Sequence, residues 1–299
     1  MSDRLAPMQR HSMPNSTSVN PLPSTFRSAV LALSLALSLP ALAQTNALRV
    51  ASDVKDIRIK ALNVLPKANG SKSDRDDCPQ AVMKPASAAA RQVAALGWAV
   101  MADVPLGSAS SGMYRAISFA GRLEAGTSAT CNITQGNVAV FDNDKLVALA
   151  YGKSAEDTAI GTLTALEGGA VRVWDGDMVA SPVGDLRVEA DGTVRLGKIA
   201  DEDAVCHGRA KVPTIYGMPI DKARKALAAK GWKPVRGGPN GEPRQSALVK
   251  QGLVETENCA GTGLAYCDFS YTSPAGKLTV TTAGEDDPPH VVDYEVKCR

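Results

Sequence analysis

The sequence predicts an α+β protein: an N-terminal, mostly antiparallel β module with one helix, followed by a small, disulfide-closed α+β module. Three observations lead to this prediction. From residue 98 to residue 197, short runs of branched and aromatic residues alternate with Gly and Asp turns, at a spacing of roughly ten residues. Two Ala-rich segments carry apolar residues at helical spacing. All six cysteines lie after residue 77.

The chain begins with the features of a secretory signal peptide. Arg27 precedes an apolar run over residues 29–39, and Pro40 and a small-x-small sequence at residues 41–43 follow it. The pattern predicts cleavage after Ala43 and a protein of the periplasm or the extracellular medium. The alternative is that this run is a buried helix or a retained membrane anchor. It is shorter than the roughly 20 residues that cross a bilayer, which favours cleavage.

Removal of residues 1–43 also changes the charge of the protein. The whole chain has 33 Lys and Arg and 31 Asp and Glu, for a formal net charge of +2. The leader contains Arg4, Arg10, Arg27 and Asp3, so 30 basic and 30 acidic residues remain. A neutral chain lacks the excess of basic residues that displaces counterions from nucleic acid, and we expect no nucleic-acid partner.

The even number of cysteines in an exported chain predicts disulfides. Six cysteines allow fifteen pairings, and spacing ranks them without choosing one. Cys259 and Cys267 are the favoured first pair, because they close a short Gly-rich loop. Cys206 and Cys298 bracket the C-terminal region and form the second pair, which leaves Cys78 with Cys131. A zinc site at Cys206 and His207 is the rival interpretation. It is disfavoured because no Cys-x-x-Cys pair is present and adjacent residues rarely bind one metal.

The first module, residues 44–205, contains one predicted helix. Apolar residues at helical spacing predict it over Pro85–Leu96, and Gly97 ends it. Alternating residues predict a strand at residues 57–64. Asp142-Asn143-Asp144 predicts a tight hairpin turn. Further strands are expected at residues 98–104, 114–119, 138–141, 146–151, 170–174, 186–189 and 193–196.

The second module, residues 206–299, begins with an extended segment at residues 211–217. Pro219 suits the first turn of a helix that we expect to run to Lys230, and Gly231 terminates it. Residues 237–243 are predicted to form a loop. Strands are expected at residues 232–235, 267–271, 278–282 and 291–296.

Residues 211–235 resemble the opening of a PASTA module, an extracytoplasmic unit of bacterial penicillin-binding proteins and Ser/Thr kinases. The resemblance rests on Val212-Pro213-x-Ile215-x-Gly217, followed by Ala223, Leu227 and Gly231-Trp232. It covers only this short segment, and PASTA modules do not usually contain the disulfides predicted around it. The resemblance implies a cell-envelope setting and contact with peptidoglycan fragments. It assigns no binding residue.

Two segments of the chain are similar to each other. Residues 91–98 and 225–232 both end a predicted helix in Gly-Trp before a strand. Either the modules descend from a duplication, or Gly capping and Trp packing arose independently in each. In both cases Trp98 and Trp232 are expected to be core residues.

The chemistry-bearing residues do not form a recognisable catalytic pattern. After the leader the chain has two histidines, His207 and His290, which limits the construction of a Ser-His-Asp triad. Two sets of neighbouring acidic residues could supply the pair of carboxylates that a glycosidase needs. They are Asp175 with Asp177, and the acidic run 285–287 (Glu285, Asp286, Asp287). A turn and a solvated loop explain them more simply.

Two further motifs are also incomplete. Asp142-Asn143-Asp144 lacks the additional oxygen ligands and the glycine of a calcium loop. Gly261-Thr262-Gly263 lacks the flanking strand and helix of a nucleotide-binding loop. We therefore expect no metal, no cofactor and no catalytic residue.

These observations favour an exported, non-catalytic protein that binds a cell-envelope component, either peptidoglycan or an envelope protein. The alternative is an inhibitor of a secreted hydrolase such as lysozyme, and a carboxylate-dependent hydrolase is a third interpretation. The surroundings of Trp174 distinguish ligand from protein binding. A pocket with converging polar groups would favour a ligand, whereas a flat polar surface would favour a protein partner.

Overall fold

A computed structural model describes residues 48–69, 72–107, 114–154, 157–238 and 241–299. Asn46–Arg299 form one compact unit. The predicted signal peptide at residues 1–43 lies outside the described residues. Within the described ranges, no helix is long and apolar enough to cross a membrane.

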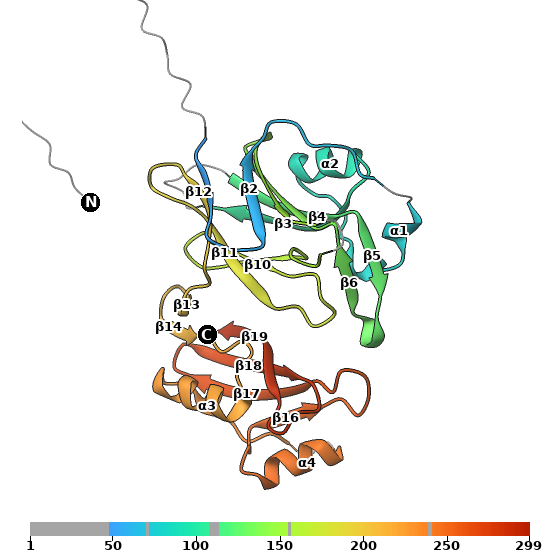
Figure 1. Ribbon diagram of the computed structural model, residues 1–299. Helices are drawn as coiled ribbons and strands as arrows, with labels where there is room; N and C mark the ends of the chain where they lie inside the picture. Colours follow the sequence, from blue (N-terminus) through green and yellow to red (C-terminus); the bar gives the residue numbers. More distant parts are fainter. Residues whose placement is uncertain (1–47, 70–71, 108–113, 155–156, 239–240) are drawn as a thin grey trace, which may run out of the picture. The chain divides into compact units, whose positions relative to one another are not determined.

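Nineteen strands and four α-helices are present in the described ranges (Figure 1). The helices are α1 (Ser73–Asp76), α2 (Ala88–Ala95), α3 (Ile220–Ala229) and α4 (Pro243–Lys250). The first strands are β1 (Val50–Ser52), β2 (Ile57–Ala61), β3 (Ala99–Leu106), β4 (Tyr114–Ala120), β5 (Arg122–Ala125), β6 (Cys131–Thr134), β7 (Asn137–Asp142), β8 (Lys145–Gly152) and β9 (Leu163–Ala165). They are followed by β10 (Val171–Trp174), β11 (Pro182–Val188), β12 (Val194–Gly197), β13 (Glu202–Val205), β14 (Ala210–Pro213), β15 (Lys233–Pro234), β16 (Thr256–Cys259), β17 (Cys267–Ser273), β18 (Gly276–Ala283) and β19 (His290–Cys298).

The fold is mostly β, so the predicted α+β class, with one helix in the first module, is wrong. Strands make up 43% of the structure and helices 14%. The sequence pattern misses α1 and α4 as well as the short strands β5, β6, β9, β13 and β16. Each of these strands has four residues or fewer, which is too short to display a period of two.

Two five-stranded sheets face each other in the first two thirds of the chain. Their strand orders are β1-β12-β11-β10-β9 and β2-β8-β7-β4-β3. Neighbouring strands are antiparallel except β1 and β12, which are parallel. One apolar cluster combines side chains of both sheets, including Val138 and Val140 from β7 with Val171 and Val173 from β10. The sheets therefore form a sandwich with a shared core.

The second sheet is buried on both of its faces. Successive residues of a strand point to opposite faces, and the alternate residues of β7, Ala139 and Phe141, pack with Ala89, Ala90 and Val93 of α2. Ser87 caps this helix, since its side chain accepts a hydrogen bond from the backbone N–H of Ala90. The helix thus adds a third layer outside the sandwich.

The last third of the chain has a core of its own. The strand order is β15-β17-β18-β19, and β16 also pairs with β17. Ile220, Ala223 and Leu227 of α3 pack against this sheet around Trp232, which is fully buried. The indole N–H of Trp232 donates to the carbonyl of Lys211 at 2.8 Å. This core draws on residues 205–296 alone, whereas the sandwich core ends at Leu196.

Both predicted helices end at the glycines that the sequence indicates. Gly97 and Gly231 have left-handed backbone angles, with φ of 89° and 83°. At the second helix the N–H of Trp232 donates to the carbonyl of Leu227, which closes the helix end. Trp98 is half-buried and meets Phe119 edge to face at 5.0 Å. The two segments therefore share a glycine in the left-handed conformation at the helix end and a tryptophan that packs against apolar side chains.

The six cysteines form three disulfides: Cys78–Cys131, Cys206–Cys298 and Cys259–Cys267. These are the pairs that spacing ranks first. The Cα atoms lie 6.2, 5.3 and 4.0 Å apart, respectively. The Cys206–Cys298 bridge joins the turn after β13 to the end of β19, and therefore ties the two ends of the C-terminal region together.

Candidate functional site

The candidate site lies on the face of the first sheet that points away from the sandwich core. Because Val171 and Val173 face the core, Arg172 and Trp174 of β10 face the other way. In the register of the sheet, Arg172 is directly opposite Asp185 of β11. The sheet thus presents a cationic, an anionic and an aromatic side chain side by side, and all three are buried.

Arg172 holds two carboxylates at once. Its Nε and Nη2 donate to Asp185 at 2.9 and 3.2 Å, and its Nη1 and Nη2 donate to Asp203 of β13 at 2.5 and 2.9 Å. Nη1 also donates to the hydroxyl of Tyr216 at 3.4 Å. These contacts use all five N–H donors of the guanidinium. The three charged side chains are 1%, 0% and 7% exposed, so this is a buried, bidentate ion cluster.

Aromatic side chains from the C-terminal region cover this cluster. The ring of Tyr216 meets Trp174 edge to face at 5.3 Å and stacks on Tyr294 of β19 at 5.4 Å. The hydroxyl of Tyr294 donates to Asp203, and the indole N–H of Trp174 donates to Thr164 at 3.1 Å. The cluster therefore links strands β10, β11 and β13 with residues of the last core.

Burial sets the protonation of these groups. It raises the pKa of Tyr216 to about 12, although the nearby Arg172 acts in the opposite direction. Burial, with the neighbouring Tyr216 and Asp203, also raises the pKa of Tyr294. For Arg172, burial lowers the pKa, but the hydrogen bonds to Asp203 and Asp185 outweigh it and the net shift is upward. At neutral pH the tyrosines are therefore neutral and the arginine is charged.

A groove of about 720 Å³ runs beside the aromatic side chains. Four aromatic residues line it: Trp174, Tyr216, Tyr266 and Tyr294. The hydroxyl of Tyr266 has no hydrogen-bond partner among the described residues. Polar contacts are available from Thr162, Thr164 and Thr281, and apolar walls from Met178, Val292 and Val296. The surroundings of Trp174 are thus a groove and not a flat polar surface.

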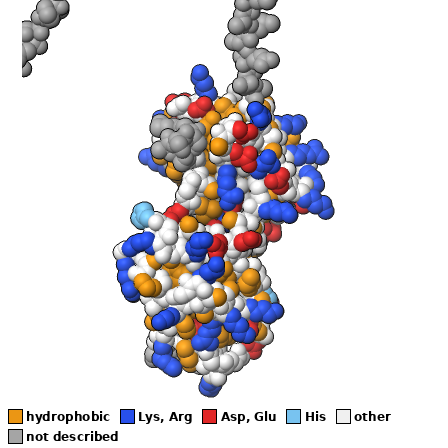
Figure 2. Space-filling view, turned by 90° about the vertical axis from the view of Figure 1, so that its left-hand side faces the viewer, with side chains coloured by type: hydrophobic (Ala, Val, Ile, Leu, Met, Phe, Trp, Pro, Cys, Tyr) orange, Lys and Arg blue, Asp and Glu red, His pale blue; other side chains and the backbone are white. Residues whose placement is uncertain are grey.

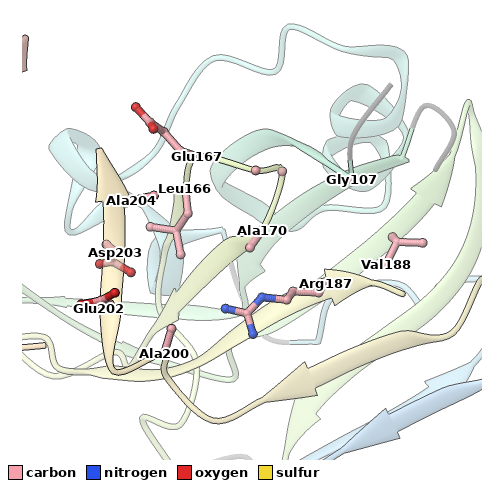
Figure 3. Close-up of a pocket in the computed structure, with 12 residues that line it drawn as sticks. Gly107, Leu166, Glu167, Ala170, Arg187, Val188, Ala200, Glu202, Asp203 and Ala204 are labelled. Atoms are coloured by element: carbon pink, nitrogen blue, oxygen red, sulfur yellow. The ribbon is translucent and has the colours of Figure 1, made fainter. Parts of the chain in front are cut away.

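A smaller cavity of about 370 Å³ lies next to the groove and shares Leu166, Glu167, Asp203 and Ala204 with it. Figure 3 shows the guanidinium of Arg187, from β11, pointing into this cavity between Ala170 and Ala200. Arg187 also donates through Nη2 to Asp185 at 3.0 Å. The two cavities therefore lie next to each other and both border the ion cluster.

The carboxylates singled out from the sequence do not form a catalytic pair. Asp175 closes a turn, because its Oδ1 accepts the backbone N–H groups of Asp177 and Ser181 at 3.2 and 2.9 Å. Burial raises its pKa. In the acidic run, Asp286 lies 3.2 Å from His290, and Asp287 accepts a hydrogen bond from Gln251. These are contacts of a turn and of an exposed loop.

His207 belongs to a turn in which Cys206, His207 and Gly208 all have positive φ. Cys206 is disulfide-bonded, and the carboxylate of Glu167 accepts the backbone N–H groups of His207 and Gly208 at 2.7 and 2.9 Å. Across the described part of the chain, no group of three metal-ligating side chains occurs. Residues 142–144 form the predicted hairpin turn, and residues 261–263 lie in the loop that the Cys259–Cys267 bridge closes.

Sequence reasoning did not identify Arg172, Asp185, Arg187 or Asp203. One signal was present in the sequence. Arg172 is a charged residue inside the apolar run 170–174, and a charged residue in a buried strand needs a partner. Its partners were not predictable, since Asp203 reaches it from a strand 31 residues later.

Figure 2 shows Lys and Arg side chains interspersed with Asp and Glu over the visible face, without a continuous basic stripe. No protein-family model, curated protein or solved structure matches this chain.

Proposed function

We propose that this protein is a non-catalytic binding protein of the bacterial cell envelope, and that the groove holds a segment of peptidoglycan. The observation that carries the proposal is the concentration of aromatic residues in one groove. The chain is only 4% aromatic, yet three of its six tyrosines and one of its three tryptophans line this groove. A core that needed aromatic filling would distribute them more evenly.

The chemistry of the groove suits a saccharide chain. Aromatic rings pack against the apolar faces of sugar rings, while the Tyr266 hydroxyl, which has no partner among the described residues, offers a hydrogen bond to a sugar hydroxyl. The threonines of β9 and β18 add further hydroxyl groups along the walls. The volume, about 720 Å³, lies within the ordinary range of ligand sites, roughly 300 to 1,000 Å³.

Three disulfides favour an oxidising compartment, the periplasm or the extracellular medium. The signal-peptide pattern at residues 29–43 and the PASTA-like segment at residues 211–235 point the same way. N-terminal sequencing of the protein recovered from bacterial cells tests this location, with Gln44 expected as the first residue. A retained leader would contradict it.

Sedimentation with purified peptidoglycan sacculi tests the function. Tyr266→Ala removes a half-buried ring from the groove and is expected to weaken binding by about 1 to 2 kcal/mol, or roughly 5- to 30-fold. Tyr151→Ala is the matched control, because Tyr151 is also half-buried but lies on β8, outside the groove. Equal binding by both variants would exclude the groove, and failure of the wild-type protein to sediment would exclude the function.

A lysozyme assay on the same preparations addresses the alternative of a hydrolase inhibitor. The proposal expects no inhibition at protein concentrations that saturate the sacculi. Inhibition without sedimentation would favour a protein partner.

A further inference from the structure

Two arginines on neighbouring positions of the same sheet face differ sharply in their hydrogen bonding. Arg172 uses all five of its N–H donors within the protein. Arg187 uses one, through Nη2 to Asp185 at 3.0 Å, and its other donors have no partner among the described residues. Its side chain is 44% exposed, and the guanidinium points into the cavity of Figure 3. A planar fork of donors is therefore directed into an open space.

The walls of this cavity leave room for a small ligand. Gly168, Gly169, Ala170 and Ala200 contribute little side-chain volume, and Leu166 adds an apolar surface. The volume of about 370 Å³ is near the lower end of the range for ligand sites. It suits a single sugar residue or a short peptide end and is too small for a polymer chain.

Three acidic residues also line the cavity, but each is engaged elsewhere. Asp203 is bound by Arg172 and Tyr294, and Glu202 pairs with Lys211 and Lys230. Glu167 accepts two backbone N–H groups, and Figure 3 shows its carboxylate directed away from Arg187. Among the described residues that line the cavity, Arg187 is thus the one charged group whose hydrogen-bonding capacity is largely unused.

We propose that this cavity is a carboxylate subsite in which Arg187 binds the acidic part of the polymer held in the neighbouring groove. The planar guanidinium matches the two oxygens of a carboxylate, which it binds in a bidentate manner. The inference rests on the proposed function, because the shared wall of Leu166, Asp203 and Ala204 places the subsite next to the saccharide groove. Peptidoglycan offers this carboxylate in two ways: the lactyl group of muramic acid once its peptide is removed, and the free end of a stem peptide.

Binding of small probes, followed by the NMR signal of the Arg187 Nε–H, tests the subsite. The saccharide pair is N-acetylmuramic acid and N-acetylglucosamine, which differ by the lactyl group and its carboxylate. The peptide pair is a stem tripeptide with a free C-terminal carboxylate and its C-terminal amide. In each pair, the probe that carries the lactyl or C-terminal carboxylate is the charged probe. We expect at least one charged probe to shift the Nε–H signal and to bind about tenfold more tightly than the probe of its pair that lacks this carboxylate. The pair that shows the preference identifies the source of the carboxylate.

Variants distinguish a direct contact from a general charge effect. Arg187→Gln is expected to abolish the preference, and Ala200→Leu, which fills the cavity and keeps the arginine, is expected to reduce it at least fivefold. The matched control is Arg195→Gln. Arg195 lies directly opposite Arg187 in the register of the sheet, but is outside the cavity and already bound to Glu189 and Asp53. This variant should retain the preference.

The outcomes separate the subsite from the proposed function. If sacculi sediment with the protein but neither charged probe is preferred, or Arg187→Gln keeps the preference, the subsite is overturned and the function stands. If a charged probe binds at Arg187 while sacculi do not sediment, the subsite stands and the peptidoglycan function fails.

Discussion

Two ion clusters on one face of the first sheet each centre on an arginine that binds two carboxylates, but one cluster is buried and the other is exposed to solvent. In one, Arg172 binds Asp185 and Asp203, and the three side chains are between 0% and 7% exposed. In the other, Arg195 of β12 binds Asp53 and Glu189, and all three are between 36% and 48% exposed. Each arginine joins carboxylates from two different segments of the chain.

Burial, and not the number of ion pairs, determines how much each cluster contributes to stability. Water solvates the Arg195 cluster whether or not its contacts form, so little is gained by forming them. The Arg172 cluster has lost that solvation and must be satisfied from within the protein. Its hydrogen bonds are therefore requirements of the fold, and the loss of one partner leaves an uncompensated charge.

The largest expected effect is that of Arg172→Met. This substitution leaves Asp203 buried without its cation and leaves Asp185 with Arg187 alone, and we expect the free energy of unfolding to fall by about 3 to 5 kcal/mol. Denaturant titration measures the change. The triple variant Arg172→Met, Asp185→Leu and Asp203→Leu should recover most of it, because it removes the buried charges together. If Arg172→Met were as stable as the wild type, burial would not make the Arg172 cluster a requirement of the fold.

Alkaline pH should disturb the buried cluster before the exposed one. Burial raises the pKa of Tyr216 to about 12, from about 10 in an unfolded chain, so the folded protein holds the phenolic proton more tightly. The resulting stability is complete below pH 10 and is lost as the pH rises from 10 to 12, by about 2 kcal/mol at pH 12. Denaturant titrations of wild type and Tyr216→Phe over this range isolate the contribution. If the free energy of unfolding fell equally with pH in both proteins, Tyr216 would not be the source of the loss.

Tyr294→Phe should have a smaller effect. The variant keeps the ring that stacks on Tyr216 and loses the hydroxyl that donates to Asp203. A hydrogen bond to a charged group contributes roughly 1.5 to 3 kcal/mol. We expect a loss near the lower value, about 1.5 kcal/mol, because Arg172 still binds Asp203. Thermal and denaturant unfolding measure it, and an unchanged midpoint would show that Asp203 does not need this donor.

Arg195→Met should have the smallest effect, since this cluster is solvated. We expect a shift in the unfolding midpoint smaller than that of any variant above. The shift should vanish in about 1 M salt, where the Debye length is about 3 Å. A loss comparable with that of Arg172→Met would mean that exposure does not separate the two clusters.

The sequence predicted the local features of the fold better than its class. Gly97 and Gly231 mark helix ends because a left-handed residue there is a local requirement, and the hairpin at residues 142–144 is equally local. The helix α4 was missed because residues 243–250 follow a stretch rich in Gly and Pro that indicates a loop. The parallel pairing of β1 with β12 joins strands about 140 residues apart, and no short-range pattern encodes it.

The candidate site was predicted less well. Acidic residues that are close in the sequence, such as Asp175 and Asp177, were considered as a catalytic pair, but their hydrogen bond stabilises a turn. The functional geometry instead depends on Arg172, Asp185 and Asp203, which only the folded sheet brings together. Trp174 was noted from the sequence, but the tyrosines beside it come from segments 42 and 120 residues further along the chain.

The Cys206–Cys298 bridge makes the last third of the protein a closed covalent ring. A protease that cuts one peptide bond between these two cysteines opens the ring but releases no fragment. The nicked chain keeps its full mass until the disulfide is reduced, and both new ends remain attached to the sandwich through Cys206. In a compartment that contains proteases, the strand that carries Tyr294 therefore stays tethered beside the groove after a single cut.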